Sequence, residues 1–345
     1  MSAEAKKFCS KLSVVVIGRN EGARLERCLE SVRAMRRGTW GVEQFDVELI
    51  YVDSGSSDGS VALAERLGAK TLALTPVRPT AALGRNAGWR AAMGEMVLFL
   101  DGDTVVDKNF AAEAMREFDD AAVACAWGHR REMYPNDSAY NRVLDLDWMY
   151  APGPAAFCGG DALFRRSALV EVDGFDESLI AGEEPEMCRR MIAAGHRIQH
   201  VDLAMTQHDL AMKSFGQYWK RAMRAGHAYA EVSVRFAASG DAFWSTEARR
   251  NRRQVLSLGV LVMAGVAASV WMRSWWPMGV VLAVLDALVL RTAWKARWKS
   301  TNAWTLVLYG AHSHLQQVPI WVGQMRYALN NRRGRRMGIV EYKQS

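Results

Sequence analysis

The sequence has few cysteines, and they are not arranged as in disulfide-rich or zinc-binding proteins. Its 345 residues contain no CxxC pair and five cysteines in all: Cys9, Cys28, Cys125, Cys158 and Cys188. An odd number without metal-like spacing, in a chain long enough to bury a large core, argues against a disulfide scaffold and against a zinc domain. We therefore expect reduced thiols in a cytoplasmic environment.

Several common motifs are also missing. There is no P-loop and no GxGxxG fingerprint, so the usual signatures of kinases and dehydrogenases are absent. The sequence has no internal repeat and no low-complexity segment. Its first residues carry charge but only a short apolar run, residues 12–17, which predicts a strand followed by a turn rather than a signal peptide for export.

Acidic residues are scarce in the C-terminal part of the chain. From Arg249 onward, 15 Lys and Arg stand against 2 Asp and Glu, a net charge of +13 within a total of +7, which leaves −6 for residues 1–248. The same part contains the longest apolar stretches, so an anionic membrane surface explains its basicity better than a nucleic acid does. We expect a membrane partner and no nucleic-acid partner.

Two apolar stretches in this part predict a helical hairpin in the membrane. Residues 255–272 carry no formal charge and would span about 27 Å as a helix, against a hydrocarbon core of about 30 Å. Residues 275–290 contain Asp286, whose cost of about 3 kcal/mol at mid-bilayer is reduced by its position four residues from the end. A pair of buried or interfacial helices is the alternative.

Basic residues flank this hairpin on both outer sides, and by the positive-inside rule both of its ends are then cytoplasmic. The clusters are Arg249, Arg250, Arg252 and Arg253 before it, and Arg291, Lys295, Arg297 and Lys299 after it. The expected organisation is a catalytic domain at residues 1–230, a basic linker or helix at 231–254, a transmembrane hairpin at 255–290, and an amphipathic interfacial helix with a basic tail at 291–345.

The first 130 residues alternate short apolar runs with amphipathic stretches, a pattern typical of βαβ units. We expect an α/β fold with a mostly parallel, Rossmann-like sheet flanked by helices. Ser57 or Asp58 could cap one helix, and Thr80 another that runs to about Met93. The expected strands are residues 12–17, 47–53, 70–75, 96–100, 122–127 and 162–165.

Polar residues follow three of these strands, where an open α/β sheet binds its ligands. The three loops are residues 18–21, residues 53–58 and Asp101-Gly102-Asp103. A divalent ion held by one or two carboxylates is an economical way to stabilise a departing nucleoside diphosphate, and two aspartates one residue apart at a strand end suit that task. Taken alone, such a triplet is weak evidence, because it also occurs by chance on acidic loops and often only caps the next helix.

Five segments together resemble family 2 of the glycosyltransferases, enzymes with the GT-A fold, in a membrane-associated bacterial form. They extend over roughly residues 12–230 and read SVVVIGRNEG, LIYVDSGSSDGS, GRNAGWRAAMGEMVLFLDGDTVV, FCGGDALFRRSALVEVDGFDESL and AGEEPEMCRRMIAAGHRI. The resemblance implies that Asp53 binds the nucleotide base and that Arg19, Glu21 and Arg85 lie near the nucleotide. For the arginines, ordinary surface ion pairing is the alternative.

The resemblance also implies a metal site and a loop at the donor sugar. Asp103 corresponds to the principal metal ligand, and Asp101 to a residue at the ribose or the metal. His208 could complete the site, although a lone histidine is more often structural. Gly159-Gly160-Asp161 resembles the family's Gly-Gly-Asn loop, where missing side chains let the backbone approach the donor sugar; a simple tight turn is the alternative.

Glu184 is the expected general base, because Gly182-Glu183-Glu184 resembles the family's acidic motif. The helical stripe it shares with Met187, Cys188 and Met191 also predicts an inward-facing, desolvated carboxylate with a raised pKa. Pro185 at the first helical position would instead make Glu184 the cap, where the helix dipole favours its charged form. Glu183 stays open as the base, since the family usually has Glu-Asp here.

The expected activity is inverting transfer of a sugar from a nucleotide sugar, taken to be a UDP-sugar, to a lipid-linked or saccharide acceptor. It would require Mn²⁺ or Mg²⁺ and serve polysaccharide or glycolipid synthesis at the cytoplasmic face of a bacterial inner membrane. Residues 217–221 do not fit the QxxRW signature of polymerising members, which favours a single transfer, and Ile17 replaces the family's usual proline. The alternative is an inactive, nucleotide-binding membrane scaffold; a nucleotidyltransferase lacks support, because residues 18–21 are not its Gly-rich basic loop.

Overall fold

The computed structural model describes residues 11–36 and 46–334. Within these ranges the chain forms two compact units. The first comprises residues up to 134 together with residues 148–210, and the second comprises residues 135–147 and the chain from residue 211 onward. The packing boundary at residue 210 precedes the expected end of the catalytic domain at 230.

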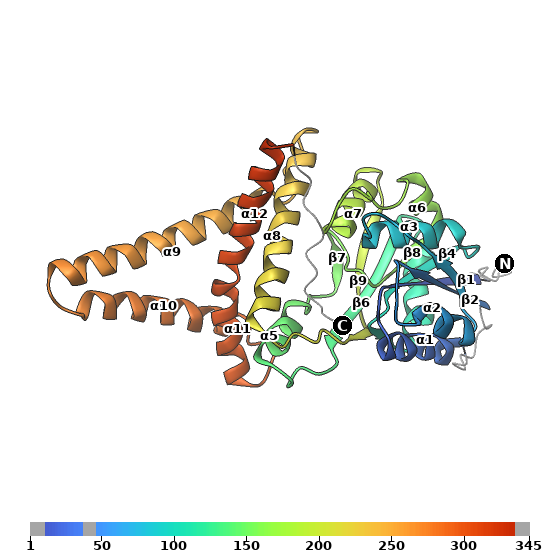
Figure 1. Cartoon of the computed structure of the whole chain (residues 1–345), viewed down its shortest axis with the longest axis horizontal. Helices are drawn as coiled ribbons and strands as arrows, with labels where there is room; N and C mark the ends of the chain where they lie inside the picture. Colours follow the sequence, from blue (N-terminus) through green and yellow to red (C-terminus); the bar gives the residue numbers. More distant parts are fainter. Residues whose placement is uncertain (1–10, 37–45, 335–345) are drawn as a thin grey trace, which may run out of the picture. The chain divides into compact units, whose positions relative to one another are not determined.

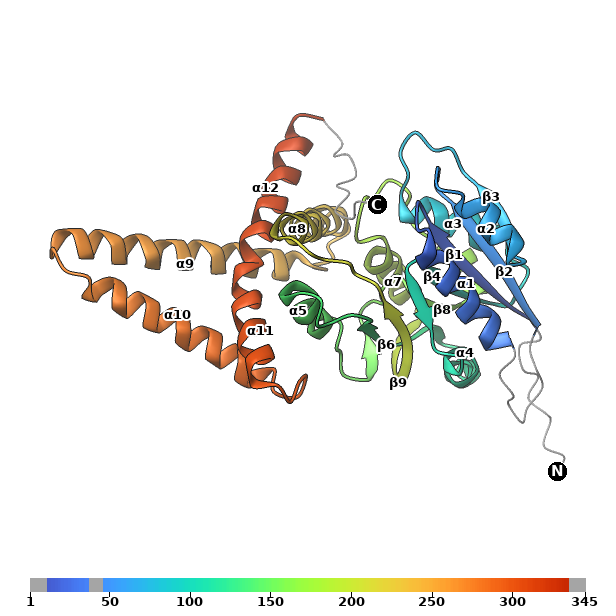
Figure 2. The same cartoon turned by 60° about the horizontal axis from the view of Figure 1, so that its bottom comes forward.

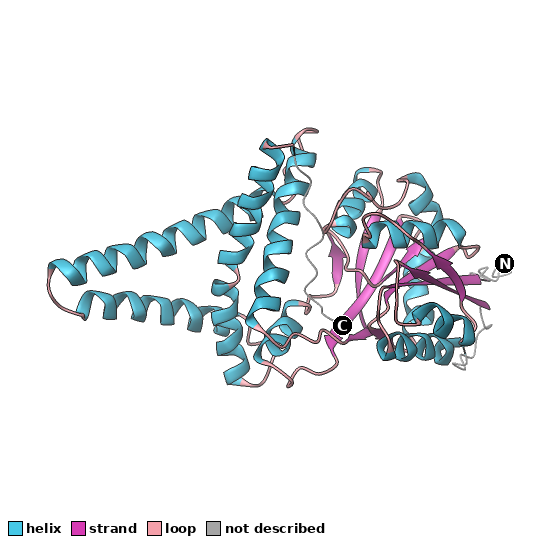
Figure 3. Ribbon diagram, viewed as in Figure 1, coloured by secondary structure: helices cyan, strands magenta, loops and turns pink. Residues whose placement is uncertain are grey.

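The first unit is built on one mixed sheet, drawn in magenta in Figure 3. Its strand order is β3-β2-β1-β4-β8-β6-β9-β5, with β7 paired to β9. All six predicted strands are present, as β1 (Lys11–Gly18), β2 (Asp46–Asp53), β3 (Lys70–Ala73), β4 (Met96–Asp101), β6 (Val123–Glu132) and β8 (Ala162–Arg165). The sheet is parallel from β3 to β4 and between β6 and β9, whereas β8 and β5 run antiparallel to their neighbours.

Helices cover both faces of this sheet, with α3, α6 and α7 on one side and α1 and α2 on the other (Figure 1). The helices of this unit are α1 (Ala23–Arg36), α2 (Ser60–Arg66), α3 (Ala81–Ala91), α4 (Phe110–Ala114), α6 (Arg166–Glu171) and α7 (Glu183–Ala193), with a 3₁₀ turn at Met115–Asp119. Because both faces are covered, the central strands are apolar without alternation: residues 12–17 of β1 and 96–100 of β4 are all buried.

The packing of α3 on the sheet fixes one wall of the site described below. Thr80 caps this helix as predicted, accepting a hydrogen bond from Leu83 N. Gly88 allows very close approach, because a Cβ there would lie 2.2 Å from Val15 Cγ1 on β1. The next turn toward the helix start carries Arg85, which this contact holds against the end of the sheet.

Three strands were not expected from the sequence: β5 (Thr104–Val106), β7 (Gly153–Ala155) and β9 (Arg197–His208). The long strand β9 mixes polar and apolar residues, and it pairs with β6, β7 and β5. It brings His208 beside the segment that follows the Asp101-Gly102-Asp103 triplet.

The second unit is helical. It contains α5 (Ala139–Asp147), α8 (Phe215–Ala237), α9 (Ser245–Trp271), α10 (Trp276–Lys295), α11 (Ala303–Leu315) and α12 (Gln317–Arg332). The predicted hairpin is present as α9 and α10, joined by a short turn (Figure 2). Both helices are long and apolar enough to cross a membrane.

The boundaries of these helices differ from those expected. Helix α9 begins at Ser245, so the basic cluster at residues 249–253 lies on its first turns. Helix α10 continues to Lys295, which places Asp286 near its middle rather than near an end. The single amphipathic helix expected within residues 291–345 is replaced by two helices, α11 and α12, which meet at Gln316.

Glycines let α8 and α12 pack backbone to backbone. A Cβ on Gly226 would lie 1.9 Å from Ile320 O, and one on Gly323 would lie 2.0 Å from Met223 O. Elsewhere in this unit, His312 joins three helices, because one ring nitrogen contacts Tyr218 Oη of α8 at 2.9 Å and the other contacts Asp147 Oδ2 of α5 at 2.9 Å.

Some predictions fall outside the described residues, namely those for Cys9, for the first ten residues and for the basic tail after residue 334. In the described ranges the cysteines are free and buried, as expected, with Cys158 Sγ and Cys188 Sγ 3.6 Å apart.

Candidate active site

The site lies at the carboxyl end of β4, where Asp101-Gly102-Asp103 leaves the sheet. Gly102 N donates to Ile17 O at 2.8 Å, which anchors the triplet to the end of β1. Asp101 N donates to Asp161 Oδ1 at 2.9 Å, and Asp161 Oδ2 in turn accepts from Thr206 Oγ1 at 2.8 Å. Asp161 is buried, and it holds the backbone of the triplet in place.

Asp103 and His208 face each other because β5 pairs antiparallel with β9. Thr104 on β5 pairs with His208 on β9, so Asp103 is the residue directly before this pair. His208 Nε2 lies 3.3 Å from Asp103 Oδ1, and both side chains are about 95% buried. The Trp148 ring stands edge-on to His208, with centroids 5.1 Å apart.

Asp101, Asp103 and His208 together offer three ligand atoms within 4.8 Å of one another. Two carboxylate oxygens and an imidazole nitrogen can bind a divalent cation such as Mn²⁺. The structure therefore brings together all three residues expected at the metal, and this donor set fits the ion.

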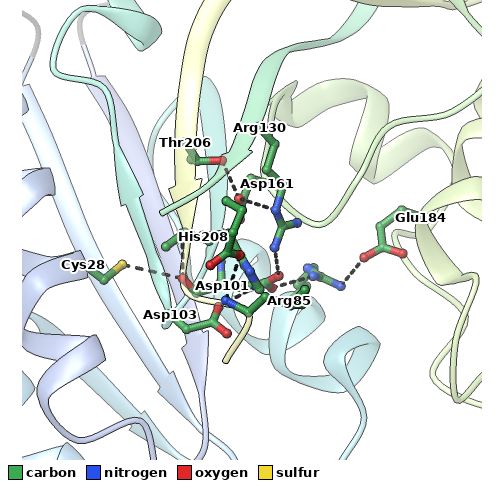
Figure 4. Close-up of polar contacts among 12 residues, drawn as sticks. Cys28, Arg85, Asp101, Asp103, Arg130, Asp161, Glu184, Thr206 and His208 are labelled. Atoms are coloured by element: carbon green, nitrogen blue, oxygen red, sulfur yellow. Dashed lines mark hydrogen bonds and ion pairs between the residues drawn. The ribbon is translucent and has the colours of Figure 1, made fainter. Parts of the chain in front are cut away.

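Arg85 lies between Asp101 of the triplet and Glu184 of α7, as Figure 4 shows. Its Nη2 contacts Asp101 Oδ1 at 2.9 Å, and its Nη1 contacts Glu184 Oε1 at 2.8 Å and Glu183 Oε1 at 3.2 Å. The side chain is 3% exposed. Burial lowers the pKa of Arg85, but the surrounding carboxylates outweigh this effect and raise it above its ordinary value.

Helix α7 begins at Glu183, with Gly182 as its N-cap at φ +84°. Pro185 is therefore the third helical residue, and Glu184 is not the cap that a proline at the first position implied. Met187, Cys188 and Met191 are fully buried, as the helical stripe predicted. Burial and the neighbouring Glu183 raise the pKa of Glu184 to about 7, against the opposing effect of Arg85.

The two glycines of the predicted donor loop differ in their surroundings. A Cβ on Gly160 would lie 2.5 Å from Arg85 Nη2 and 3.0 Å from Asp101 Oδ2. Gly159 is exposed, and a Cβ there would meet no heavy atom within 4 Å. Gly160 thus leaves the space that the ion pair between Arg85 and Asp101 occupies.

The expected nucleotide-binding residues lie at the ends of β1 and β2. Asp53 is buried and accepts hydrogen bonds from Tyr51 Oη, Gly55 N and Ser56 N at 2.8–2.9 Å. Arg19 is exposed in the turn after β1. Glu21 pairs with Arg24 at 3.1 Å, and its side chain lies against the triplet, because a Cβ on Gly102 would be 3.1 Å from Glu21 Cγ.

Arg130 is a member of the site that the sequence reasoning missed. Its guanidinium lies 3.6 Å from Asp101 Oδ2 and 3.8 Å from Asp161 Oδ2, and it stacks over the Trp148 ring at 4.9 Å. Thr206 and Trp148 were also missed. An arginine at the end of the apolar run in β6 was the one available signal, but its partners come from β4, β8 and the segment after α5, none of them near in sequence.

A sheet of this order, with an acidic triplet and a histidine at one strand end and a buried acidic helix start beside them, defines a GT-A type protein. A model of "Glycosyl transferase family 2" matches residues 13–172, and a model of "Glycosyl transferase family group 2" matches residues 96–312, more than half of the chain. The chain belongs to the family 2 glycosyltransferases.

Relatives of this chain are named as glycosyltransferases. The chain is 27% identical over 218 residues to the pre-mycofactocin glycosyltransferase of Mycobacterium tuberculosis strain H37Rv, covering 57% of this chain and 42% of that protein. It is 25% identical over 242 residues to an N-acetylglucosaminyltransferase of Mesorhizobium japonicum, covering 62% of this chain and 54% of that protein. The chain thus spans about half the length of these relatives.

A solved structure has the same fold. The mannosyltransferase PcManGT from Pyrobaculum calidifontis, in complex with GDP-Man and Mn²⁺, superposes with a TM-score of 0.56 at 17% identity. The match covers 94% of this chain and 88% of that chain.

Proposed function

We propose that the chain transfers a sugar, with inversion, from a nucleotide-sugar donor to the hydroxyl of a lipid-linked or saccharide acceptor. The observation that carries the proposal is the placement of an acidic metal-binding group and a buried carboxylate with a raised pKa around one arginine. A UDP-sugar is the proposed donor, and polysaccharide or glycolipid synthesis is the proposed setting. The names of the curated relatives support sugar transfer in general.

On the donor side, the residues at the strand ends would bind and orient the nucleotide sugar. Asp53 would accept a hydrogen bond from the base, with Arg19 and Glu21 nearby, and the exposed loop at Gly159 would face the sugar. Asp101, Asp103 and His208 would hold Mn²⁺ or Mg²⁺, which supplies positive charge against the diphosphate. The Mn²⁺ in the similarly folded mannosyltransferase supports this choice of metal.

On the acceptor side, Glu184 would take the proton from the attacking hydroxyl. A general base works best with a pKa near the working pH, and the pKa of about 7 meets that condition. Glu183 contacts the same guanidinium but is more deeply buried, with 5% of its side chain exposed against 15% for Glu184. This difference in exposure favours Glu184 as the base.

We further propose that α9 and α10 insert into a membrane and keep the enzyme at its cytoplasmic face. Tryptophans are exposed at both ends of this hairpin, as in the aromatic belts of membrane proteins. They are Trp271, Trp275 and Trp276 near the turn, and Trp294, Trp298 and Trp304 at the other end. The central position of Asp286 in α10 would cost about 3 kcal/mol, which the surrounding apolar surface must offset.

Turnover of nucleotide sugars by Asp103→Ala and Glu184→Gln variants tests the proposal. Each should lose about 10²- to 10⁴-fold in kcat, with Asp173→Ala and Glu171→Gln, both outside the site, as matched controls. Unchanged activity of either site variant would exclude the role assigned to that residue, and retention of anomeric configuration would exclude direct displacement. If the protein binds nucleotide in a metal-dependent way but turns over no nucleotide sugar in any acceptor mixture, the alternative of an inactive membrane scaffold is favoured.

A further inference from the structure

Arg85 contacts both the Asp101-Gly102-Asp103 triplet and the start of α7. Its two terminal nitrogens divide between these sides, with Nη2 on Asp101 and Nη1 on Glu183 and Glu184. All three contacts lie between 2.8 and 3.2 Å, and the guanidinium is 3% exposed. A contact this deeply buried is screened little by water, so its charge acts strongly on each partner.

The other groups around Glu184 disfavour its ionised form. Burial removes its hydration, and Glu183 adds a like charge from the same helix turn. The charged and titratable groups that face it are Glu183, Arg85, Asp101, Cys158 and Cys188. Among these groups, Arg85 carries a positive charge, which lowers the pKa of Glu184.

The geometry of the site also protects this contact. Helix α3, which carries Arg85, packs closely on β1 at Gly88. Gly160 leaves room for Arg85 Nη2 beside Asp101. A side chain placed with this much backbone support is suited to setting the position of another group.

We propose that Arg85 is a positioning residue for Glu184, which it holds in place and whose negative charge it stabilises, while it also contacts Asp101 on the donor side. This role rests on the proposed function of Glu184 as the base. It differs from the position near the nucleotide that the resemblance implied for Arg85. The distinguishing consequence is that removal of Arg85 changes the pH dependence of the reaction and not only its rate.

The test is the pH profile of kcat at saturating donor for Arg85→Met and Arg85→Lys. Loss of the positive charge should raise the pKa of Glu184, so the acid limb should move to higher pH by about 1 to 3 units in Arg85→Met. Activity at pH 7 should then fall about 5- to 500-fold and recover in part above pH 9. Arg85→Lys keeps the charge and should show a smaller shift in the same direction.

Arg90→Met on the same helix is the matched control, since Arg90 is half-exposed and pairs with Asp173 and Glu177, which lie outside the site. It should leave the profile unchanged. An equal loss at every pH in both Arg85 variants, or a loss confined to nucleotide affinity measured by calorimetry, would overturn the positioning role. If Arg85→Met does not fold, the positioning role is judged from the Arg85→Lys variant, by the direction in which the acid limb of its pH profile moves.

Glu184→Gln separates this inference from the proposed function. If Glu184→Gln retains full activity, the assigned base is wrong and the role of Arg85 falls with it. If Glu184→Gln is inactive while both Arg85 variants keep the midpoint of the wild type, only the positioning role is rejected.

Discussion

Two residues of the site show how the size and the charge of one side chain affect its neighbours. Gly160 shows the effect of space, because a methyl group there would overlap the guanidinium of Arg85. Glu184 shows the effect of charge, because burial and Glu183 hold its pKa near 7 against the pull of Arg85. The sequence predicted Gly160, Glu184 and Arg85 as site residues, but the contacts of Arg85 with Asp101 and Glu184 could not be inferred from spacing, since these partners lie 16 and 99 positions away.

Gly160→Ala should keep the fold and lose about 10- to 100-fold in kcat, because displacing Arg85 from Asp101 by about 1 Å disturbs the site. Gly159→Ala is the matched control, since a Cβ there meets nothing within 4 Å. Steady-state kinetics of the two variants, with circular dichroism to confirm folding, makes the comparison. Similar losses in both variants would mean that the loop needs glycine for another reason.

Glu184→Gln should change the pH dependence of stability. A carboxyl whose folded pKa of about 7 exceeds its ordinary value of 4.5 contributes stability below pH 4.5, which is lost as the pH rises through 7. The neutral variant should therefore gain up to about 3 kcal/mol relative to the wild type between pH 4.5 and pH 8. Thermal unfolding across this range measures the gain, and Glu171→Gln, which is exposed, should show none.

A helix or strand could be predicted where its own residues show the pattern, and was missed where it depends on pairing with strands distant in sequence. The strands β1, β2 and β4 each contain a mostly apolar run that is bounded by polar loops, so they were recognised directly. The sequence of β9, RIQHVDLAMTQH, mixes polar and apolar residues, and only its pairing with three other strands stabilises it as a strand. The expected start of α7 at Pro185 was wrong by two residues, because Gly182 in the left-handed region provides the cap instead.

Backbone contact between α8 and α12 predicts a sharp sensitivity to small side chains. Gly226→Ala or Gly323→Ala should each destabilise the helical unit by about 1 to 3 kcal/mol, because the added methyl overlaps a carbonyl of the facing helix. Gly259→Ala and Gly279→Ala, where a Cβ meets nothing within 4 Å, should cause no such loss. Thermal unfolding in detergent compares the four variants, and a loss of equal size in the controls would contradict the packing argument.

For the whole molecule, the unresolved choice between spanning and interfacial helices concerns α9 and α10. Their exposed apolar residues and their two sets of tryptophans favour insertion, whereas Asp286 near the middle of α10 opposes it. The turn at residues 272–275 and the loop after α10 would then lie on opposite sides of the membrane. This difference can be measured without removing any part of the protein.

A cysteine at Ser274, in the turn, should react with a membrane-impermeant maleimide in intact cells. A cysteine at Ser300, after α10, should react only once the cells are opened. The background should carry Cys9→Ser, since the other cysteines are buried. Protection of both positions in intact cells would indicate helices that lie in the cytoplasmic interface.

The pairing of β5 with β9 also determines when the site can form during synthesis. Asp103 and His208 meet across these strands but are separated by 105 positions in the chain. Since the N-terminal part of a chain emerges from the ribosome first, β4 and the acidic triplet can fold well before their histidine partner exists. A nascent or truncated chain that ends before β9 would lack His208, one of the three proposed metal ligands, so full-strength binding of a metal would require synthesis of the chain through β9.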